Sequence, residues 1–281
     1  MLSPKTTAKY ERLRSILHAM ESVAIGYSGG VDSTLLLKVA VDTLGTKTVA
    51  MIGRSATYPT REFEEAMTIA AQIGAHTIVV DTEETDEVKF RENPPDRCYY
   101  CKTELFGKLE EIASGEHINW IADGTITDDV GDFRPGMRAK NEKQVRSPLL
   151  EAGLNKTEVR ELSHHLGLPT WDKPSFACLS SRFPYGTAIT EENLKRVDAA
   201  ETFLRDEGFR RYRVRFHDAS TARIEVAPEE IHRLLDDDFR GRLVDHLKQL
   251  GFVYVTVDLQ GYRTGSMNEV LPEGVRTHYS S

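Results

Sequence analysis

The sequence lacks the features that mark several classes of protein. No window reaches the roughly 18 consecutive apolar residues of a membrane-spanning helix, and the N-terminal stretch MLSPKTTAKYERLRSILHAMES has no apolar core of the signal-peptide type. Basic residues are in the minority, with 36 Lys and Arg against 44 Asp and Glu, and the net charge is −8. We therefore expect a soluble, cytoplasmic protein with no membrane partner, and nucleic acid is not an expected partner because no broad basic surface is available to bind it.

Cysteine is also scarce. Only Cys98, Cys101 and Cys178 occur in 281 residues, so the chain does not have the disulfide framework of a small secreted domain. The length favours two domains, each with enough apolar residues to bury a core.

The most informative stretch is SGGVDS, residues 28–33. It follows SVAIGYS, a short run rich in β-forming residues, and precedes TLLLKVAV, which has the apolar pattern of a packed helix. An isolated Gly-Gly pair is usually only a capped turn. The full hexapeptide between a strand and a helix instead indicates a site that binds phosphate.

The residues of this stretch suit an anion for physical reasons. A strand that ends in Ser28, Gly29 and Gly30 before a helix beginning near Asp32 leaves backbone N–H groups pointing outward, with the helix dipole behind them. Glycine allows close approach, and Ser28 and Ser33 add hydroxyl donors. The stretch lacks the Gly-Lys-Ser/Thr ending of the Walker loop.

Strand, SGGVDS and helix together resemble the pyrophosphate loop of the N-type ATP pyrophosphatases, which split ATP into AMP and pyrophosphate. The resemblance implies that ATP, with Mg²⁺ as the divalent cation, adenylates a carboxyl or carbonyl oxygen of the substrate. It also implies these ATP-binding residues: Ser28, Gly29, Gly30, Asp32, Ser33, Ser55 in the adenine contact, and Gly124 in IADGT.

A second segment has the same resemblance. In LNKTEVRELSHHLGLP, Asn155 stands three residues before Glu158, which is a helix-start signature and is similar to the superfamily's second phosphate-side helix. Lys156 is then a candidate phosphate contact, or else a solvated lysine on a first turn. His164 and His165 have no ligand-spaced partner, and we interpret them as helix-face residues.

Strand-like and helix-like segments alternate at 47–53, 60–74 and 76–81. This order is typical of βαβ units. It predicts an α/β fold over residues 1–186, with a doubly wound, mostly parallel sheet of the adenine nucleotide alpha hydrolase-like (PP-loop) kind and its ligands at the strand C-termini.

The pattern changes after FPYGTAIT. Helices are expected at 191–206 and 228–249, and strands at 211–217, 222–226 and 253–259. These elements predict a smaller α+β domain over residues 187–281, for substrate binding and oligomerisation.

Arginines alternate along the first strand of that domain. Arg211, Arg213 and Arg215 share one face, which is either a solvated sheet face or a site for an anion. Guanidinium groups bind phosphate and carboxylate in bidentate fashion. Arg213 and Arg215 are therefore candidate substrate-binding residues, with Glu201 and Glu225 as candidate substrate or metal contacts.

The cysteines leave four interpretations open. In RCYYCK, Cys98 and Cys101 would share one face of a helix start, and Cys178 lies in a Pro- and Ser-rich connector that could bring a third thiolate. Three thiolates suit a [4Fe-4S] cluster whose fourth iron has no protein ligand. A zinc site would need a fourth ligand that is not adjacent, a redox pair would leave Cys178 unexplained, and the pair could be incidental.

Four segments closely resemble the LarE family of ATP-dependent sulfur transferases: WDKPSFACLSSRFPYG (171–186), RPGMRAK (134–140), RVRFHDASTARIEV (213–226) and GYRTGSMN (261–268). Members are similar in adenylating a carboxylate of pyridinium-3,5-biscarboxylic acid mononucleotide and replacing its oxygen with sulfur. The product leads to the nickel-pincer cofactor that the lactate racemase of some bacteria uses.

The resemblance implies two routes for the sulfur. In members with one cysteine, the residue that matches Cys178 gives up its own sulfur and becomes dehydroalanine. With Cys98 and Cys101 present, the chain resembles the members in which three thiolates hold a [4Fe-4S] cluster, where a sulfide could bind. Cys178 is the expected catalytic residue in either case.

The expected cofactors are thus ATP, Mg²⁺ and a [4Fe-4S] cluster. The expected partners are the nucleotide substrate, further copies of the chain in a homo-oligomer, and the upstream and downstream enzymes of nickel-pincer cofactor synthesis. A tRNA thiolase with a cluster is the nearest alternative, but the acidic charge and the lack of a recognisable RNA-binding appendage weigh against it. A non-catalytic nucleotide-binding regulator is the other, and the intact loop and Cys178 argue against it.

Overall fold

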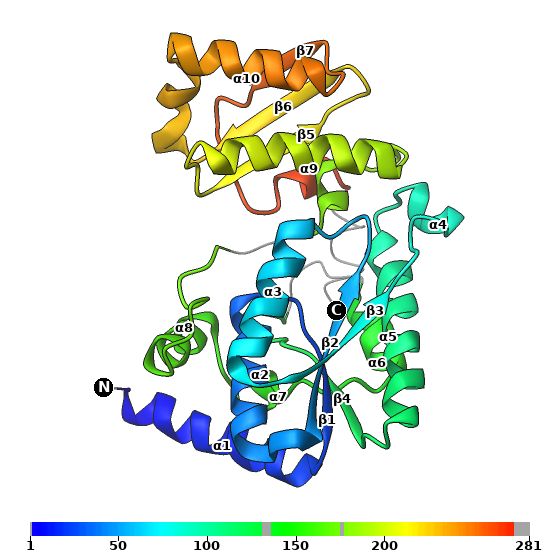
Figure 1. Ribbon diagram of the computed structural model, residues 1–281, viewed down its shortest axis with the longest axis vertical. Coiled ribbons are helices and arrows are strands. Elements are labelled where there is room, and N and C mark those ends of the chain that lie inside the picture. Colours follow the sequence, from blue (N-terminus) through cyan, green and yellow to red (C-terminus); the bar gives the residue numbers. More distant parts are fainter. Residues whose placement is uncertain (1, 131–135, 175–176, 273–281) are drawn as a thin grey trace. The chain divides into compact units, whose positions relative to one another are not determined.

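Four short strands form a parallel sheet in the order β3-β2-β1-β4 (Figure 1). They are β1 (Val23–Gly26), β2 (Thr48–Arg54), β3 (His76–Asp81) and β4 (Trp120–Ala122). The computed structural model to which they belong describes residues 2–130, 136–174 and 177–272.

Both faces of this sheet are apolar. Because successive residues of a strand face opposite sides, Val23 and Ile25 of β1 enter one core and Ala24 enters the other. Helices supply the rest of the first core from α1 (Pro4–Met20), α2 (Val31–Leu44), α3 (Thr60–Ile73), α7 (Pro148–Glu151) and α8 (Lys156–His165), and of the second core from α5 (Arg97–Gly115) and α6 (Gly136–Glu142). The predicted α/β fold, with helices on both faces, is confirmed.

The chain divides into two units. Of the described residues, the first comprises 2–84, 98–130 and 136–174, and the second comprises 85–97 and 177–272. Across the described part of the chain, the helices are all too short or too polar to span a bilayer.

The second unit contains a three-stranded sheet in the order β5-β6-β7. Its strands β5 (Tyr212–Phe216) and β6 (Thr221–Val226) pair antiparallel, whereas β6 and β7 (Tyr254–Val257) pair parallel. The helix α9 (Glu191–Asp206) lies at the position that the sequence predicts and contacts β5.

The prediction of one continuous helix over 228–249 is wrong. The structure has a 3₁₀ segment, Pro228–Leu235, followed by α10 (Asp237–Gln249). Asp236 separates them because its backbone is extended (ψ 132°) and its side chain accepts a hydrogen bond from the N–H of Phe239 at 3.1 Å. Asp236 is therefore the N-cap of a new helix.

A segment distant in sequence completes the second unit. It carries the short helix α4 (Val88–Arg91), and Asn93 exchanges hydrogen bonds with the backbone near residue 185, donating to the Pro184 carbonyl at 2.8 Å and accepting from the Gly186 N–H at 2.9 Å. The guanidinium of Arg97 lies 5.0 Å from the centre of the Tyr185 ring. These contacts hold the chain that follows Cys178.

Candidate functional site

The phosphate loop (residues 28–33) connects β1 to α2 in a way that requires glycine. Gly29 has φ +61°, and a Cβ there would stand 2.7 Å from the Cβ of Ala66 on α3. Gly30 is the N-cap of α2 and has no side chain to cover the first N–H groups of the helix. These groups are thus available to an anion at the positive end of the helix dipole.

Polar contacts fix the loop from both sides. The hydroxyls of Ser28 and Ser33 lie 3.2 Å apart, and the Tyr58 hydroxyl donates to the Ser28 carbonyl at 2.9 Å. Burial, followed by the charge of Glu62, raises the pKa of Tyr58, so this hydroxyl stays protonated as a donor.

Lys173 anchors the loop as well. Its ammonium lies 3.4 Å from the Gly29 carbonyl, 2.8 Å from a carboxylate oxygen of Glu62 and 3.2 Å from one of Glu65. The loop is therefore tied to α3 through a lysine far along the chain.

Other predicted ATP-binding residues follow neighbouring strands at the same sheet edge. Ser55 comes directly after β2, and its hydroxyl lies 2.9 Å from that of Thr57. Gly124 comes after β4, where a Cβ would stand 2.9 Å from the backbone nitrogen of Ser33. Ser28, Ser55 and Gly124 thus follow three adjacent strands, where α/β folds bind their ligands.

The second phosphate-side segment also reaches the loop. Asn155 and Glu158 form the predicted capping box at the start of α8. The ammonium of Lys156 binds both carboxylate oxygens of Asp32, at 2.6 and 2.8 Å, and its backbone N–H donates to Asp128 at 3.0 Å. The structure therefore places Lys156 beside the phosphate loop, in an ion pair.

Cys98 and Cys101 lie near the start of α5, about one helical turn apart, and are partly exposed. Part of the RPGMRAK motif packs on the same turn. Arg138 lies over the ring of Tyr99 at 3.6 Å, and a Cβ on Gly136 would stand 2.5 Å from Cδ of Lys102. Arg134 and Pro135 lie outside the described residues.

Cys178 lies in the second unit, just before a short 3₁₀ segment, Leu179–Arg182. The guanidinium of Arg182 is fully buried and donates to the carbonyls of Ala177 and Cys178, the latter at 3.0 Å. Glu201 on α9 accepts from Nε and Nη2 of Arg182 at 2.9 and 2.8 Å, and also from the Val214 N–H at 2.9 Å. Both oxygens of the predicted substrate contact Glu201 are therefore engaged within the protein.

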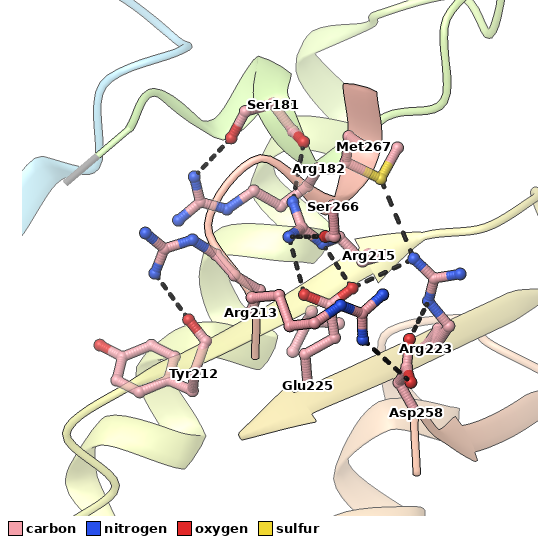
Figure 2. Close-up of polar contacts among 12 residues, drawn as sticks. Ser181, Arg182, Tyr212, Arg213, Arg215, Arg223, Glu225, Asp258, Ser266 and Met267 are labelled. Carbon is pink, nitrogen blue, oxygen red and sulfur yellow. Dashed lines mark hydrogen bonds and ion pairs between the residues drawn. The ribbon is translucent and has the colours of Figure 1, made fainter. Parts of the chain in front are cut away.

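A charged face of the sheet lies next to this segment (Figure 2). Arg215 donates to both oxygens of Glu225 at 2.9 and 2.7 Å, to the Ser181 carbonyl at 3.0 Å and to the Ser266 hydroxyl at 3.2 Å. Arg223 donates to the same glutamate at 3.1 Å. Glu225 is completely buried and Arg215 is 5% exposed, so this is not a solvated sheet face.

The three predicted arginines differ in environment. Arg211 is exposed and pairs with Glu229 at 2.6 Å. Arg213 is partly exposed, lies 4.9 Å from the centre of the Tyr262 ring, and has a lowered pKa because of burial and then repulsion from Arg182. A cation held in this way favours a nearby anion, so Arg213 is the best placed of the three to bind one.

The cysteines, all within the described residues, form no disulfide. In the same part of the chain, no group of three or more His, Cys, Asp or Glu side chains is arranged to hold a metal ion. Cys98 and Cys101 belong to the first unit and Cys178 to the second, and their shared ligation of a cluster stays a prediction.

Sequence reasoning missed three residues of these sites: Tyr58, Lys173 and Arg182. Tyr58 had no signal, because it acts through a loop carbonyl 30 residues away. Lys173 and Arg182 stand five residues before and four residues after Cys178 in the segment that resembles a known family, and this proximity could have drawn attention to them, although Lys173 acts on a loop carbonyl 144 residues away.

Comparisons with known proteins agree with this arrangement. Residues 10–102 match the family model described as NAD synthase. Over 264 residues the chain is 40% identical to the pyridinium-3,5-bisthiocarboxylic acid mononucleotide synthase of Lactiplantibacillus plantarum, covering 94% of this chain and 95% of that protein. It is 45% identical to an uncharacterized protein of Synechocystis over 94% of this chain and 98% of that one. The glutamine-hydrolyzing GMP synthase of Coxiella burnetii is 26% identical over 53% of this chain and 32% of its own length.

Proposed function

This chain belongs to the LarE family of ATP-dependent sulfur transferases, and we propose that its phosphate loop activates the substrate as an acyl-adenylate while Cys178 takes part in delivering the sulfur. The reaction is the ATP-dependent insertion of sulfur into a pyridinium dicarboxylate mononucleotide, a step of nickel-pincer cofactor synthesis. In this proposal the loop and the cysteine act in turn on the same carboxylate.

The phosphate loop binds the ATP phosphates in this proposal. The observation that carries it is Gly29, whose left-handed φ and lack of a side chain, where a Cβ would stand 2.7 Å from that of Ala66, leave the N-terminus of α2 open between Ser28 and Ser33. Asp32 offers the carboxylate oxygens that Mg²⁺ prefers. Mg²⁺ would neutralise charge on the phosphates, and Lys156 would shift its ammonium from Asp32 toward them.

Arg213 and Arg215 bind the anionic groups of the substrate nucleotide. Arg213 is partly exposed and is destabilised as a cation by burial and by Arg182, which favours direct contact with a phosphate or carboxylate. Arg215 is held by Glu225, Ser181 and Ser266, so it contributes mainly charge and a fixed surface. Glu225 keeps that surface in place.

The sulfur transfer begins when a substrate carboxylate oxygen attacks the α-phosphate of ATP and pyrophosphate leaves. The Cys178 thiolate then attacks the acyl carbon, and AMP leaves with the electron pair of the broken bond, which gives a thioester. Loss of the Cα proton of Cys178 breaks its Cβ–S bond. The thiocarboxylate departs, and dehydroalanine stays in the chain.

A [4Fe-4S] cluster on Cys98, Cys101 and Cys178 is the second route that we propose. Cys98 and Cys101 fit it in being partly exposed thiols one helical turn apart, outside any disulfide. Cys98, Cys101 and Cys178 would hold the cluster, which would supply the sulfur as sulfide. Cys178 would then keep its own sulfur.

Single-turnover assays of the full chain test these assignments. With ATP, Mg²⁺ and the dicarboxylate substrate, we expect AMP and pyrophosphate, and Cys178→Ala should keep pyrophosphate release but lose sulfur transfer. Mass spectrometry of iron-free protein should find Cys178 lighter by one hydrogen sulfide, whereas protein carrying iron and sulfide should keep its mass. Formation of ADP, or full sulfur transfer by Cys178→Ala, would contradict the assignment.

A further inference from the structure

Arg182 is buried without solvent contact although it is an arginine. Arg182 is 0% exposed, and Glu201 binds one edge of the guanidinium in bidentate fashion, accepting from Nε and Nη2 at 2.9 and 2.8 Å. Burial by itself lowers the pKa of Arg182, but the charge and hydrogen bonds of Glu201 raise it above its ordinary value, with a smaller contribution from Cys178. Arg182 therefore stays charged inside the second unit.

The third nitrogen of this guanidinium is directed at the backbone around Cys178. Nη1 donates to the Ala177 carbonyl, to the Cys178 carbonyl at 3.0 Å and to the Ser181 hydroxyl at 2.9 Å. The two carbonyls belong to the peptide groups on either side of Cys178. Together they restrain its φ of −54° and ψ of 154°, and these two angles fix the direction of the Cα–Cβ bond.

Glu201, the partner of Arg182, is itself fixed by a second hydrogen bond. Glu201 lies on α9, is 6% exposed, and accepts from the Val214 N–H on β5 with one of the oxygens that bind Arg182. Val214 stands between Arg213 and Arg215 in the strand. The cysteine backbone is thus linked through one guanidinium and one carboxylate to the strand that carries the proposed substrate arginines.

We propose that Arg182 is the positioning residue of Cys178, which it holds in register with the arginines of β5 during sulfur transfer. This inference rests on the proposed function of Cys178. It assigns Glu201 to the same task, as the group that orients the Arg182 fork, in place of the direct substrate or metal contact expected from the sequence.

Lysine, methionine and glutamine substitutions separate position from charge. Arg182→Lys keeps a cation but loses the fork, Arg182→Met loses both, and Glu201→Gln keeps the shape while weakening the pair. The control is Arg196→Met, because Arg196 lies on the same helix as Glu201 but bonds the carbonyls of Leu250 and Ala219, at 2.7 and 3.2 Å, instead of the Cys178 segment.

Three readouts are measured on the full chain: pyrophosphate release, sulfur transferred per turnover, and the rate at which iodoacetamide alkylates Cys178, followed by peptide mass spectrometry. Misplacement of a reacting group by about 1 Å costs about 100-fold. We expect sulfur transfer to fall by about 10- to 100-fold in Arg182→Lys and Arg182→Met, and less in Glu201→Gln, with pyrophosphate release within about twofold of the parent. Alkylation reports whether the Cys178 side chain has moved, so its rate should change in both Arg182→Lys and Arg182→Met, which lose the fork that holds the two carbonyls, and stay at the parental value in Arg196→Met.

The results of these assays distinguish failure of the Arg182 proposal from failure of the proposed function of Cys178. If Arg182→Lys and Glu201→Gln are folded and transfer sulfur at the parental rate, or if Arg196→Met causes the same loss, Arg182 has only a structural part. If Cys178→Ala itself transfers sulfur, the proposed function fails first. Where Arg182→Met does not fold, the isosteric Glu201→Gln still decides between the two roles.

Discussion

Gly29→Ala is expected to disable the phosphate loop through two effects that can be separated. At φ +61° an alanine takes a left-handed conformation, at a cost of about 1–2 kcal/mol. Its Cβ would also stand 2.7 Å from the Cβ and 3.2 Å from the Cα of Ala66, and overpacking of this kind typically costs about 1–3 kcal/mol. The free energy of unfolding of the first unit should therefore fall by about 2–5 kcal/mol.

Three further variants isolate each effect. Gly74→Ala has φ +81° with nothing within 4 Å of the added Cβ, so only the conformational cost of about 1–2 kcal/mol applies. Adding Ala66→Gly to Gly29→Ala removes the nearest contact and should recover part of the loss. Gly30→Ala, at φ −78° and 3.5 Å from the Ser28 hydroxyl, should fold normally but bind ATP more weakly, because its methyl group occupies the path of the phosphate.

The assay uses the two tryptophans, Trp120 and Trp171, which both lie in the first unit. Fluorescence-detected urea unfolding therefore reports on that unit, and calorimetric titration with a non-hydrolysable ATP analogue reports on the loop. If Gly29→Ala is as stable as Gly74→Ala and binds the analogue like the parent, the close approach of Gly29 to α3 does not shape a phosphate site.

Three other predictions concern the second unit. Arg213→Ala should weaken binding of the substrate nucleotide by about 1.5–3 kcal/mol while ATP affinity, measured by calorimetry, stays unchanged; equal losses for both ligands would contradict this. Arg215→Ala should in addition destabilise the unit by about 3–5 kcal/mol in urea unfolding followed by circular dichroism, because it removes the main partner of the buried Glu225. Burial raises the pKa of Glu201, but its ion pair with Arg182 lowers it overall, below the ordinary 4.5. Its stabilising contribution is thus present above pH 4.5 and lost as the pH falls through the folded-state value. Urea unfolding at a series of acidic pH values should therefore show a smaller loss of stability in Glu201→Gln than in the parent.

Local signals predicted most of the first unit correctly. The apolar runs of β1, β2 and β3, SGGVDS and the Asn155 capping box each act over a few residues, and the structure has them where the sequence indicates. The parallel sheet then brings Ser28, Ser55 and Gly124 to one edge, because strands joined by helices place their carboxyl ends together. Placing these three residues at one edge requires only the order of the strands and helices, which the sequence pattern predicts.

The second unit shows where such reasoning stops. Alternation along β5 puts Arg213 and Arg215 on one face. Whether that face is exposed to solvent depends on Ser181 and Ser266, which are distant in sequence and contact Arg215. Asp236 likewise divides the helix expected over 228–249, because its side chain caps the next one.

Arg182 shows most clearly what local sequence patterns do not predict, because its role depends on its burial. An arginine in a Ser- and Pro-rich connector is expected to be exposed to solvent. A glutamate in the middle of α9 is likewise expected to lie on an exposed face of the helix. Each is hidden only because the other is present, since an unpaired charge would not stay buried. Their pairing joins positions 19 residues apart, and it holds one nitrogen, Nη1 of Arg182, against the carbonyls of Ala177 and Cys178, a contact that no local pattern encodes. The chemistry of the cysteine is thus predictable from its residue type and segment, whereas its orientation depends on a buried ion pair that only the folded unit creates.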